Sequence, residues 1–147
     1  MLKIMKTEII TPGPTGTIDS VCVFDVIDRL SESLEPLFIS KATSIVNDVP
    51  PDLFVGTDKN VLASVLSSLL NHLIINEGCH TIQISAKLFG NVVLIHIKDR
   101  GGKNYSPVAQ NITRIQPMVE RLKGFVGITS HRHDRTTIAF SFVNMSN

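Results

Sequence analysis

The clearest pattern of apolar and polar positions along the chain lies between residues 58 and 78. Apolar residues recur there at intervals of three and four, which places them on one face of an α-helix. Thr57 and Asp58 precede the pattern and offer side-chain oxygens that can cap a helix, and Asn76–Glu77–Gly78 ends it. The predicted buried face consists of Val61, Leu62, Val65, Leu66, Leu69, Leu70, Leu73 and Ile74.

Two weaker helical patterns lie on either side of this helix. The first runs from Phe24 to Phe38 and contains Pro36, which is expected to kink or shorten it. The second runs from Ile112 to Leu122, where Pro117 either kinks the helix or starts another one. Gly124 follows and is predicted to be the C-cap of this last helix.

Alternating apolar and polar residues predict strands in the rest of the chain. Residues 82–88 and 93–97 form one predicted hairpin around Gly90–Asn91, and residues 125–130 and 136–143 form a second around HRHDR. Shorter strands are expected at 3–10, 21–23 and 44–46, with a turn-rich break at 11–17. The order of elements predicts an α+β fold, a two-layer α/β sandwich whose mixed sheet carries its helices on one face. Residues 1–20 are expected to be an N-terminal strand and linker, and residues 21–147 the domain.

Composition narrows the classes of partner. The 147 residues fit one domain, and the formal net charge of +1 gives no electrostatic footprint for nucleic acid or an anionic membrane. Charged residues make up 18% of the chain and apolar residues 43%. This balance suggests that a partner or a second copy covers some apolar surface, although a small apolar-rich domain can also bury such surface internally. Cys22 and Cys79 are too few for a disulfide framework or a zinc site, so we expect reduced, buried thiols. No segment approaches the ~20 apolar residues of a membrane span, and we expect a cytoplasmic protein or the soluble part of a larger one.

The order and spacing of several segments resemble the ATP-binding domain of sensor histidine kinases, which is related to the gyrase-type ATPases. SVLSSLLNHLI corresponds to the asparagine-bearing helix of that family, and VLIHIKDRGG resembles the strand that ends in its adenine-binding aspartate and glycine. RLKGFVGITS and RTTIAFSF resemble its closing strands, so the resemblance extends from Val23 to Phe142. It implies the histidine kinase ATPase fold, in which the nucleotide lies between the helices on the sheet.

The resemblance also implies a remnant nucleotide-binding set. Asp99 matches the aspartate that accepts a hydrogen bond from the adenine amino group, and Gly101 matches the glycine that lets the backbone turn beneath the base. Thr136 matches a hydroxyl beside that aspartate. His72 stands where the family has its Mg²⁺-holding asparagine, and Ser68 stands one turn earlier. Asp99 could instead be a strand-end residue entering a turn, and His72 a phosphate donor, a zinc ligand or a polar residue at a pocket mouth.

Several departures from the family weaken the phosphate chemistry. Histidine is a poor substitute at His72, because Mg²⁺ prefers oxygen ligands. Lys103 occupies the position of the family's distal glycine, and the stretch from Lys103 to Ala109 is much shorter than the family's lid. VAQNI replaces the glycine-rich turn whose N–H groups meet the phosphates. None of the five histidines, 72, 80, 96, 131 and 133, lies on an N-terminal helix with an acidic neighbour, as the phosphoacceptor would.

These departures lead to one leading hypothesis and two alternatives. The leading hypothesis is a degenerate histidine-kinase-like ATPase domain that acts as a binding or regulatory module in two-component signalling, without efficient phosphoryl transfer. We expect no catalytic residue, no metal site and no bound cofactor; His131 and His133 could share a metal, but no third ligand is apparent. One alternative is a functional catalytic domain that binds ATP and Mg²⁺. The other is a dimerisation or phosphorelay docking module, whose partner is a histidine kinase, a response regulator or a second copy of the chain.

Overall fold

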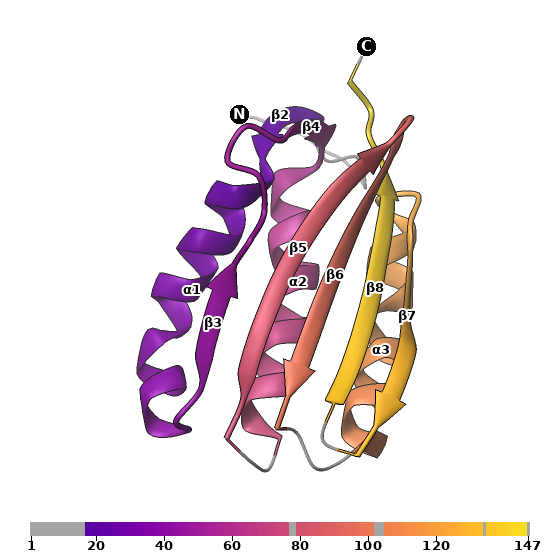
Figure 1. Ribbon diagram of the computed structural model, residues 1–147. Coiled ribbons are helices and arrows are strands. Elements are labelled where there is room, and N and C mark those ends of the chain that lie inside the picture. Colours follow the sequence, from indigo (N-terminus) through magenta and orange to yellow (C-terminus); the bar gives the residue numbers. More distant parts are fainter. Residues whose placement is uncertain (1–16, 77–78, 102–104, 134, 147) are drawn as a thin grey trace, which may run out of the picture.

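The computed structural model describes residues 17–76, 79–101, 105–133 and 135–146 of the chain. These residues form two layers, a twisted sheet and three helices that cover one of its faces (Figure 1). The predicted α+β sandwich is therefore confirmed. The strand expected at residues 3–10 lies outside the described residues. In chain order the elements are β2 (Asp19–Cys22), α1 (Val23–Ser40), β3 (Ser44–Asn47), β4 (Phe54–Thr57), α2 (Lys59–Ile75), β5 (Thr81–Phe89), β6 (Val92–Arg100), α3 (Tyr105–Glu120), β7 (Phe125–Arg132) and β8 (Arg135–Val143).

The main sheet has the strand order β3-β5-β6-β8-β7. β3 runs parallel to β5, and the other neighbours are antiparallel, so the predicted mixed sheet is confirmed. β2 and β4 form a separate antiparallel pair. Since β2 begins at Asp19, the proposed start of the domain at residue 21 falls within that strand. Within the described residues, no element covers the sheet face opposite the helices (Figure 1).

α2 is the central helix of the core, and the prediction of its buried face is confirmed. All eight predicted apolar residues are buried. Asp58 caps the helix, since its carboxylate accepts hydrogen bonds from the backbone N–H groups of Asn60 and Val61 at 3.0 and 3.1 Å. The inward side chains of the sheet, such as Ile84, Ile95 and Phe140, belong to the same buried cluster. α2 thus fixes the helical layer against the strands that carry the candidate site.

Neither helix-interior proline ends its helix. α1 continues past Pro36 to Ser40, and α3 continues past Pro117 to Glu120, so neither proline shortens its helix or starts another. Both prolines are exposed. Water can therefore hydrate the carbonyl that loses its hydrogen-bond donor when proline occupies a helix interior.

Three smaller expectations are wrong. Lys123, not Gly124, has the left-handed backbone with φ of 55°. Gly124 instead allows a close approach, because a Cβ there would lie 2.1 Å from the Ser141 carbonyl oxygen. β4 was not expected, since it is short and lies between a proline pair and a helix cap. Both cysteines are free as predicted, but Cys22 is half-buried and Cys79 is exposed, so neither is a buried thiol.

Among the described residues, no helix is both long and apolar enough to cross a membrane.

Candidate functional site

Asp99 lies at the end of a central strand, as the sequence predicts. It is the penultimate residue of β6, where it pairs with Thr136 of β8 on one side and Ile82 of β5 on the other. It continues the inward series of Val93, Ile95 and Ile97, so its side chain belongs to the helix-covered face and is only 3% exposed. The strand register thus brings Asp99 and Thr136 together beneath the helices.

The carboxylate of Asp99 has a partner within the chain. His80, which precedes β5, places Nδ1 at 2.8 Å from Asp99 Oδ1 and Nε2 at 2.9 Å from the carbonyl oxygen of Asn76. The His80 side chain is 0% exposed and the Asp99 side chain 2%. Because a carbonyl oxygen can only accept a hydrogen bond, Nε2 carries a proton.

One further proton is shared between Nδ1 and the carboxyl group. Either a charged His80 donates to an ionised Asp99, or a protonated Asp99 donates to a neutral His80, and both states leave the pair with no net charge. Burial raises the pKa of Asp99 above its ordinary value of 3.8, while the hydrogen bond and positive charge of His80 act in the opposite direction. In either state, Asp99 Oδ1 is already hydrogen-bonded.

The other two residues predicted near Asp99 also have internal roles. The hydroxyl of Thr136 lies 2.8 Å from Nδ1 of His131. Gly101 has φ of +115°, and a Cβ there would lie 1.8 Å from the Cys79 carbonyl oxygen. Only glycine fits such a backbone and such a close approach. The glycine of the IKDRGG segment is therefore required by the packing of the segment that carries His80.

Ser68 and His72 lie one turn apart on α2, on the side that faces α3. The Ser68 hydroxyl accepts a hydrogen bond of 3.1 Å from the amide of Asn111 on α3, and Asn111 is only 2% exposed. His72 is half-buried, and its Nδ1 donates to the Ser68 carbonyl oxygen at 3.0 Å. The predicted residues thus form two groups, Ser68 with His72 on α2 and Asp99 with Gly101 and Thr136 at the end of β6.

Sequence reasoning missed His80 and Asn111. His80 had a detectable signal, because the predicted Gly90–Asn91 turn places Asp99 opposite Ile82, and His80 is the diagonal neighbour on the same sheet face. The sequence contains no such signal for Asn111, since the side of α3 that meets Ser68 depends on how the two helices pack. Among the described residues, no three His, Cys, Asp or Glu side chains lie close enough together to hold a metal ion.

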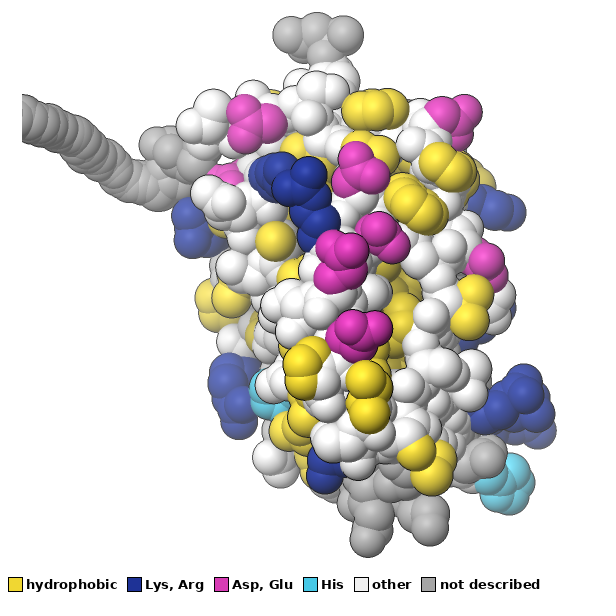
Figure 2. Space-filling view, turned by 90° about the vertical axis from the view of Figure 1, so that its left-hand side faces the viewer, with side chains coloured by type: hydrophobic (Ala, Val, Ile, Leu, Met, Phe, Trp, Pro, Cys, Tyr) yellow, Lys and Arg dark blue, Asp and Glu magenta, His cyan; other side chains and the backbone are white. Residues whose placement is uncertain are grey.

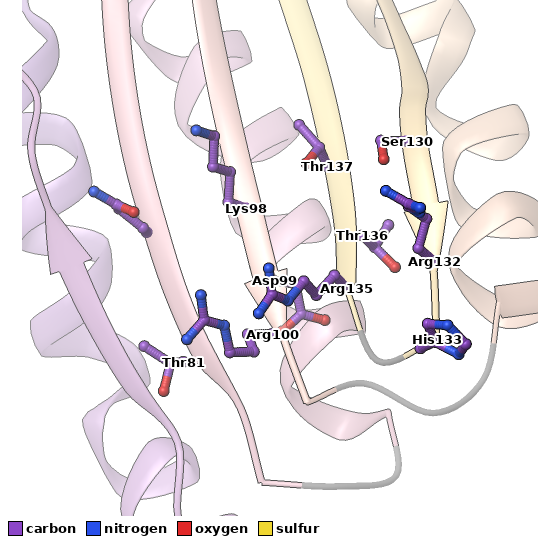
Figure 3. Close-up of a pocket in the computed structure, with 11 residues that line it drawn as sticks. Thr81, Lys98, Asp99, Arg100, Ser130, Arg132, His133, Arg135, Thr136 and Thr137 are labelled. Carbon is purple, nitrogen blue, oxygen red and sulfur yellow. The ribbon is translucent and has the colours of Figure 1, made fainter.

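A second feature lies at the lower end of β5, β6, β8 and β7, on the sheet face away from the helices (Figure 3). It is a hollow of about 890 Å³. Four cationic side chains, Lys98, Arg100, Arg132 and Arg135, line it together with polar side chains. Asp99 and Thr136 also contribute to its wall, although their side chains are buried.

Comparison with known proteins identifies the fold. No protein-family model and no curated protein matches the sequence. Histidine kinase AdeS of Acinetobacter baumannii matches with a TM-score of 0.75 at 14% identity, over 90% of this chain and 70% of that chain. The catalytic domain of histidine kinase ThkA matches with 0.74 at 13% identity, over 86% and 95% of the two chains. ThkA in complex with response regulator protein TrrA matches with 0.68 at 11% identity, over 87% and 42%. The chain therefore has the fold of histidine kinase catalytic domains.

Proposed function

We propose that this chain is a module of two-component signalling that binds a protein partner and does not transfer phosphoryl groups from ATP. The observation that carries the proposal is the buried hydrogen bond between His80 and Asp99. In the family that the sequence resembles, the corresponding aspartate accepts its hydrogen bond from adenine. Here His80, a side chain of the protein itself, already binds one oxygen of that carboxylate, Oδ1.

The free energy of the His80–Asp99 pair is larger than the free energy of a hydrogen bond from a nucleotide. Removing one partner of a buried charged pair costs about 3–5 kcal/mol, because the other group stays buried without compensation. A hydrogen bond from an adenine amino group returns only about 1 kcal/mol net. An adenine amino group that bound at Asp99 Oδ1 would therefore have to displace a stronger interaction than the one it offers.

The α2–α3 contact supports the same conclusion for the phosphate side. Ser68 is hydrogen-bonded across to Asn111, so the two helices contact each other directly at the position of a family asparagine. His72 offers nitrogen where Mg²⁺ prefers oxygen. Because phosphoryl transfer relies on positioning and metal-assisted charge stabilisation, these substitutions remove its main supports.

The partner class follows by analogy with a structural neighbour. ThkA is a histidine kinase that has been solved with the response regulator TrrA. We extend that class to this chain and propose a response regulator or a histidine kinase as its partner, with residues 21–147 as the functional module. The fold alone does not carry this assignment.

A calorimetric titration with ATP, in the presence and absence of Mg²⁺, tests the proposal. We expect a Kd weaker than about 1 mM, which corresponds to ~4 kcal/mol of binding free energy. Asp99→Asn is the matched variant, since it keeps the size and one hydrogen-bonding oxygen of the side chain. Micromolar binding that disappears in Asp99→Asn would favour the alternative of a functional ATP-binding catalytic domain.

A further inference from the structure

The open face of the sheet carries a row of arginines on three adjacent strands. The register pairs Arg100 of β6 directly with Arg135 of β8, and Arg135 directly with Arg132 of β7. Lys98 lies on the same face, two residues from Arg100, and pairs with Gln83 and Thr137. Figure 3 shows these side chains around one hollow. We call these four residues the cationic row.

Nothing described in the chain neutralises the cationic row. Like charges at directly opposite strand positions repel each other and destabilise a sheet. No described residue forms an ion pair with any of the four, and the one carboxylate that lines the hollow, Asp99, is hydrogen-bonded to His80. Asp134 lies outside the described residues. A cluster that costs stability and has no ion-pair partner among the described residues is expected where a ligand supplies the opposite charge.

The positive charge of the hollow is local, because the chain as a whole carries only +1. Exposed acidic side chains gather instead on the side of the molecule formed by α1 and β3 (Figure 2). On α1 they are Asp25, Asp28, Glu32 and Glu35. The charges are thus separated between a helix surface and the open sheet face.

The other end of the open face carries exposed apolar side chains, together with the exposed Lys87 of β5. Phe89 and Val92 are register partners at the tip of the β5–β6 hairpin, and they are 57% and 38% exposed. Phe125, at the start of β7 on the same face, is 64% exposed. One uncovered face therefore carries exposed aromatic and aliphatic side chains at one end and four cations at the other. Exposed apolar patches bordered by polar groups are typical of protein interaction sites.

We infer that the open sheet face docks an acidic segment of a protein partner, whose carboxylates bind the cationic row while its apolar side chains cover Phe89, Val92 and Phe125. Arginine suits this role because its planar guanidinium binds a carboxylate through two parallel hydrogen bonds. Ser130, Thr137 and Gln83 add neutral hydrogen-bonding groups around the hollow.

Other polyanions fit the face less well. No Phe, Tyr or Trp among the side chains that the structure describes lines the hollow, so these residues offer nucleic acid bases no stacking platform there. The cations surround a recess, whereas an anionic membrane would need them on a protruding surface. The inference rests on the proposed function only in naming a protein as the partner. The docking surface itself is separate from the candidate nucleotide site, because it lies on the sheet face opposite the helices.

The test uses the full ¹⁵N-labelled chain and two synthetic peptides of equal length. One peptide carries four glutamates and two leucines, and the other carries glutamines in place of the glutamates. We expect the glutamate peptide alone to shift the amide signals of Arg100, Arg132 and Arg135, with an affinity that falls as salt is added. Arg135→Glu should weaken this binding by about tenfold or more, equivalent to ~1.4 kcal/mol, while Arg114→Glu on α3 should leave it within a factor of about two.

Several outcomes would overturn the inference. In the peptide titrations, the contradicting results are the absence of shifts with the glutamate peptide and equal shifts with both peptides. Equal effects of Arg135→Glu and Arg114→Glu on binding would also contradict it. So would tighter binding of a single-stranded oligonucleotide or of anionic phosphatidylserine vesicles through the same arginines. Arg135→Gln gives a second readout that does not need a ligand. Its urea midpoint should rise, since it relieves like-charge repulsion, and a fall would mean that the cationic row stabilises the sheet. No nucleotide is present, so failure here leaves the ATP titration unaffected.

Discussion

At the scale of single residues, the shared proton between His80 and Asp99 governs the chemistry of the candidate site. The carboxyl group of Asp99 is buried, and one of its oxygens, Oδ1, is already hydrogen-bonded to His80. The pair also links folding to pH, because burial raises the pKa of Asp99 in the folded state. The free energy of unfolding should therefore report on the state of this carboxyl group.

Asp99→Asn should change the pH dependence of stability in a defined direction. Since the folded pKa lies above the ordinary value of 3.8, the folded wild type holds a proton that the unfolded chain has lost. The contribution of Asp99 to stability is thus greatest below 3.8 and falls as pH rises through the folded pKa. The unfolding free energy of Asp99→Asn relative to wild type should rise over that window, by about 1.4 kcal/mol per unit of raised pKa.

Urea unfolding at a series of pH values from acid to neutral measures this difference. His72→Asn is a suitable control, because it changes a half-buried histidine on α2 that is hydrogen-bonded to Ser68. If the unfolding free energy of Asp99→Asn instead falls relative to that of wild type as pH rises, the folded state favours the ionised carboxylate. The raised pKa of Asp99 would then be contradicted, and with it the state in which Asp99 holds the shared proton.

At the scale of elements, α2 presents two sides of different character. Leu70 is 0% exposed, whereas His72 is half-buried and faces α3. Leu70→Ala should therefore cost about 2–5 kcal/mol through cavity formation. His72→Ala should cost about 1 kcal/mol or less. Urea midpoints of the two variants provide the comparison, and equal losses would show that His72 is a structural core residue.

Gly101→Ala tests the structural role of the glycine after β6. The added Cβ would clash with the Cys79 carbonyl oxygen at 1.8 Å, in a backbone with φ of +115°. We expect a loss of at least about 2 kcal/mol in the free energy of unfolding. Gly90→Ala is the matched control, because Gly90 has a positive φ of 60° but no atom lies within 4 Å of its added Cβ. Similar losses in both variants would mean that backbone strain alone, without the clash, explains the glycine.

The predictability of these elements from sequence depended on whether local pattern or packing decided them. The periodicity of α2 gave all eight buried positions and the Asp58 cap, because a long amphipathic helix encodes its face locally. The turn at Gly90–Asn91 fixed the hairpin register and placed Asp99 beside Thr136 once β8 paired. The continuity of α1 through Pro36 and the Ser68–Asn111 contact depend on solvent exposure and helix packing, which no local pattern encodes.

At the scale of the whole molecule, the two faces of the sheet carry different kinds of side chains. The helix-covered face carries the residues that match the nucleotide site, and each of them now has a partner or a packing role inside the chain. The open face carries exposed apolar side chains and four cations that have no ion-pair partner in the part of the chain that the structure describes. The histidine kinase fold is thus shared with AdeS and ThkA at only 11–14% sequence identity.

The most direct measurement is an NMR titration of the ¹⁵N-labelled chain with ADP and Mg²⁺, which follows the ring protons of His80 together with the amides of α2 and α3. The imidazole protons of His80 should be protected from exchange, because both ring nitrogens are hydrogen-bonded and the side chain is 0% exposed. At nucleotide concentrations up to about 1 mM, we expect the His80 signals and the amides of Ser68, His72 and Asn111 to remain unchanged. Saturable shifts at these residues, together with loss of the His80 signals, would show that nucleotide displaces the internal pair and that the chain retains the ATP-binding function of its fold.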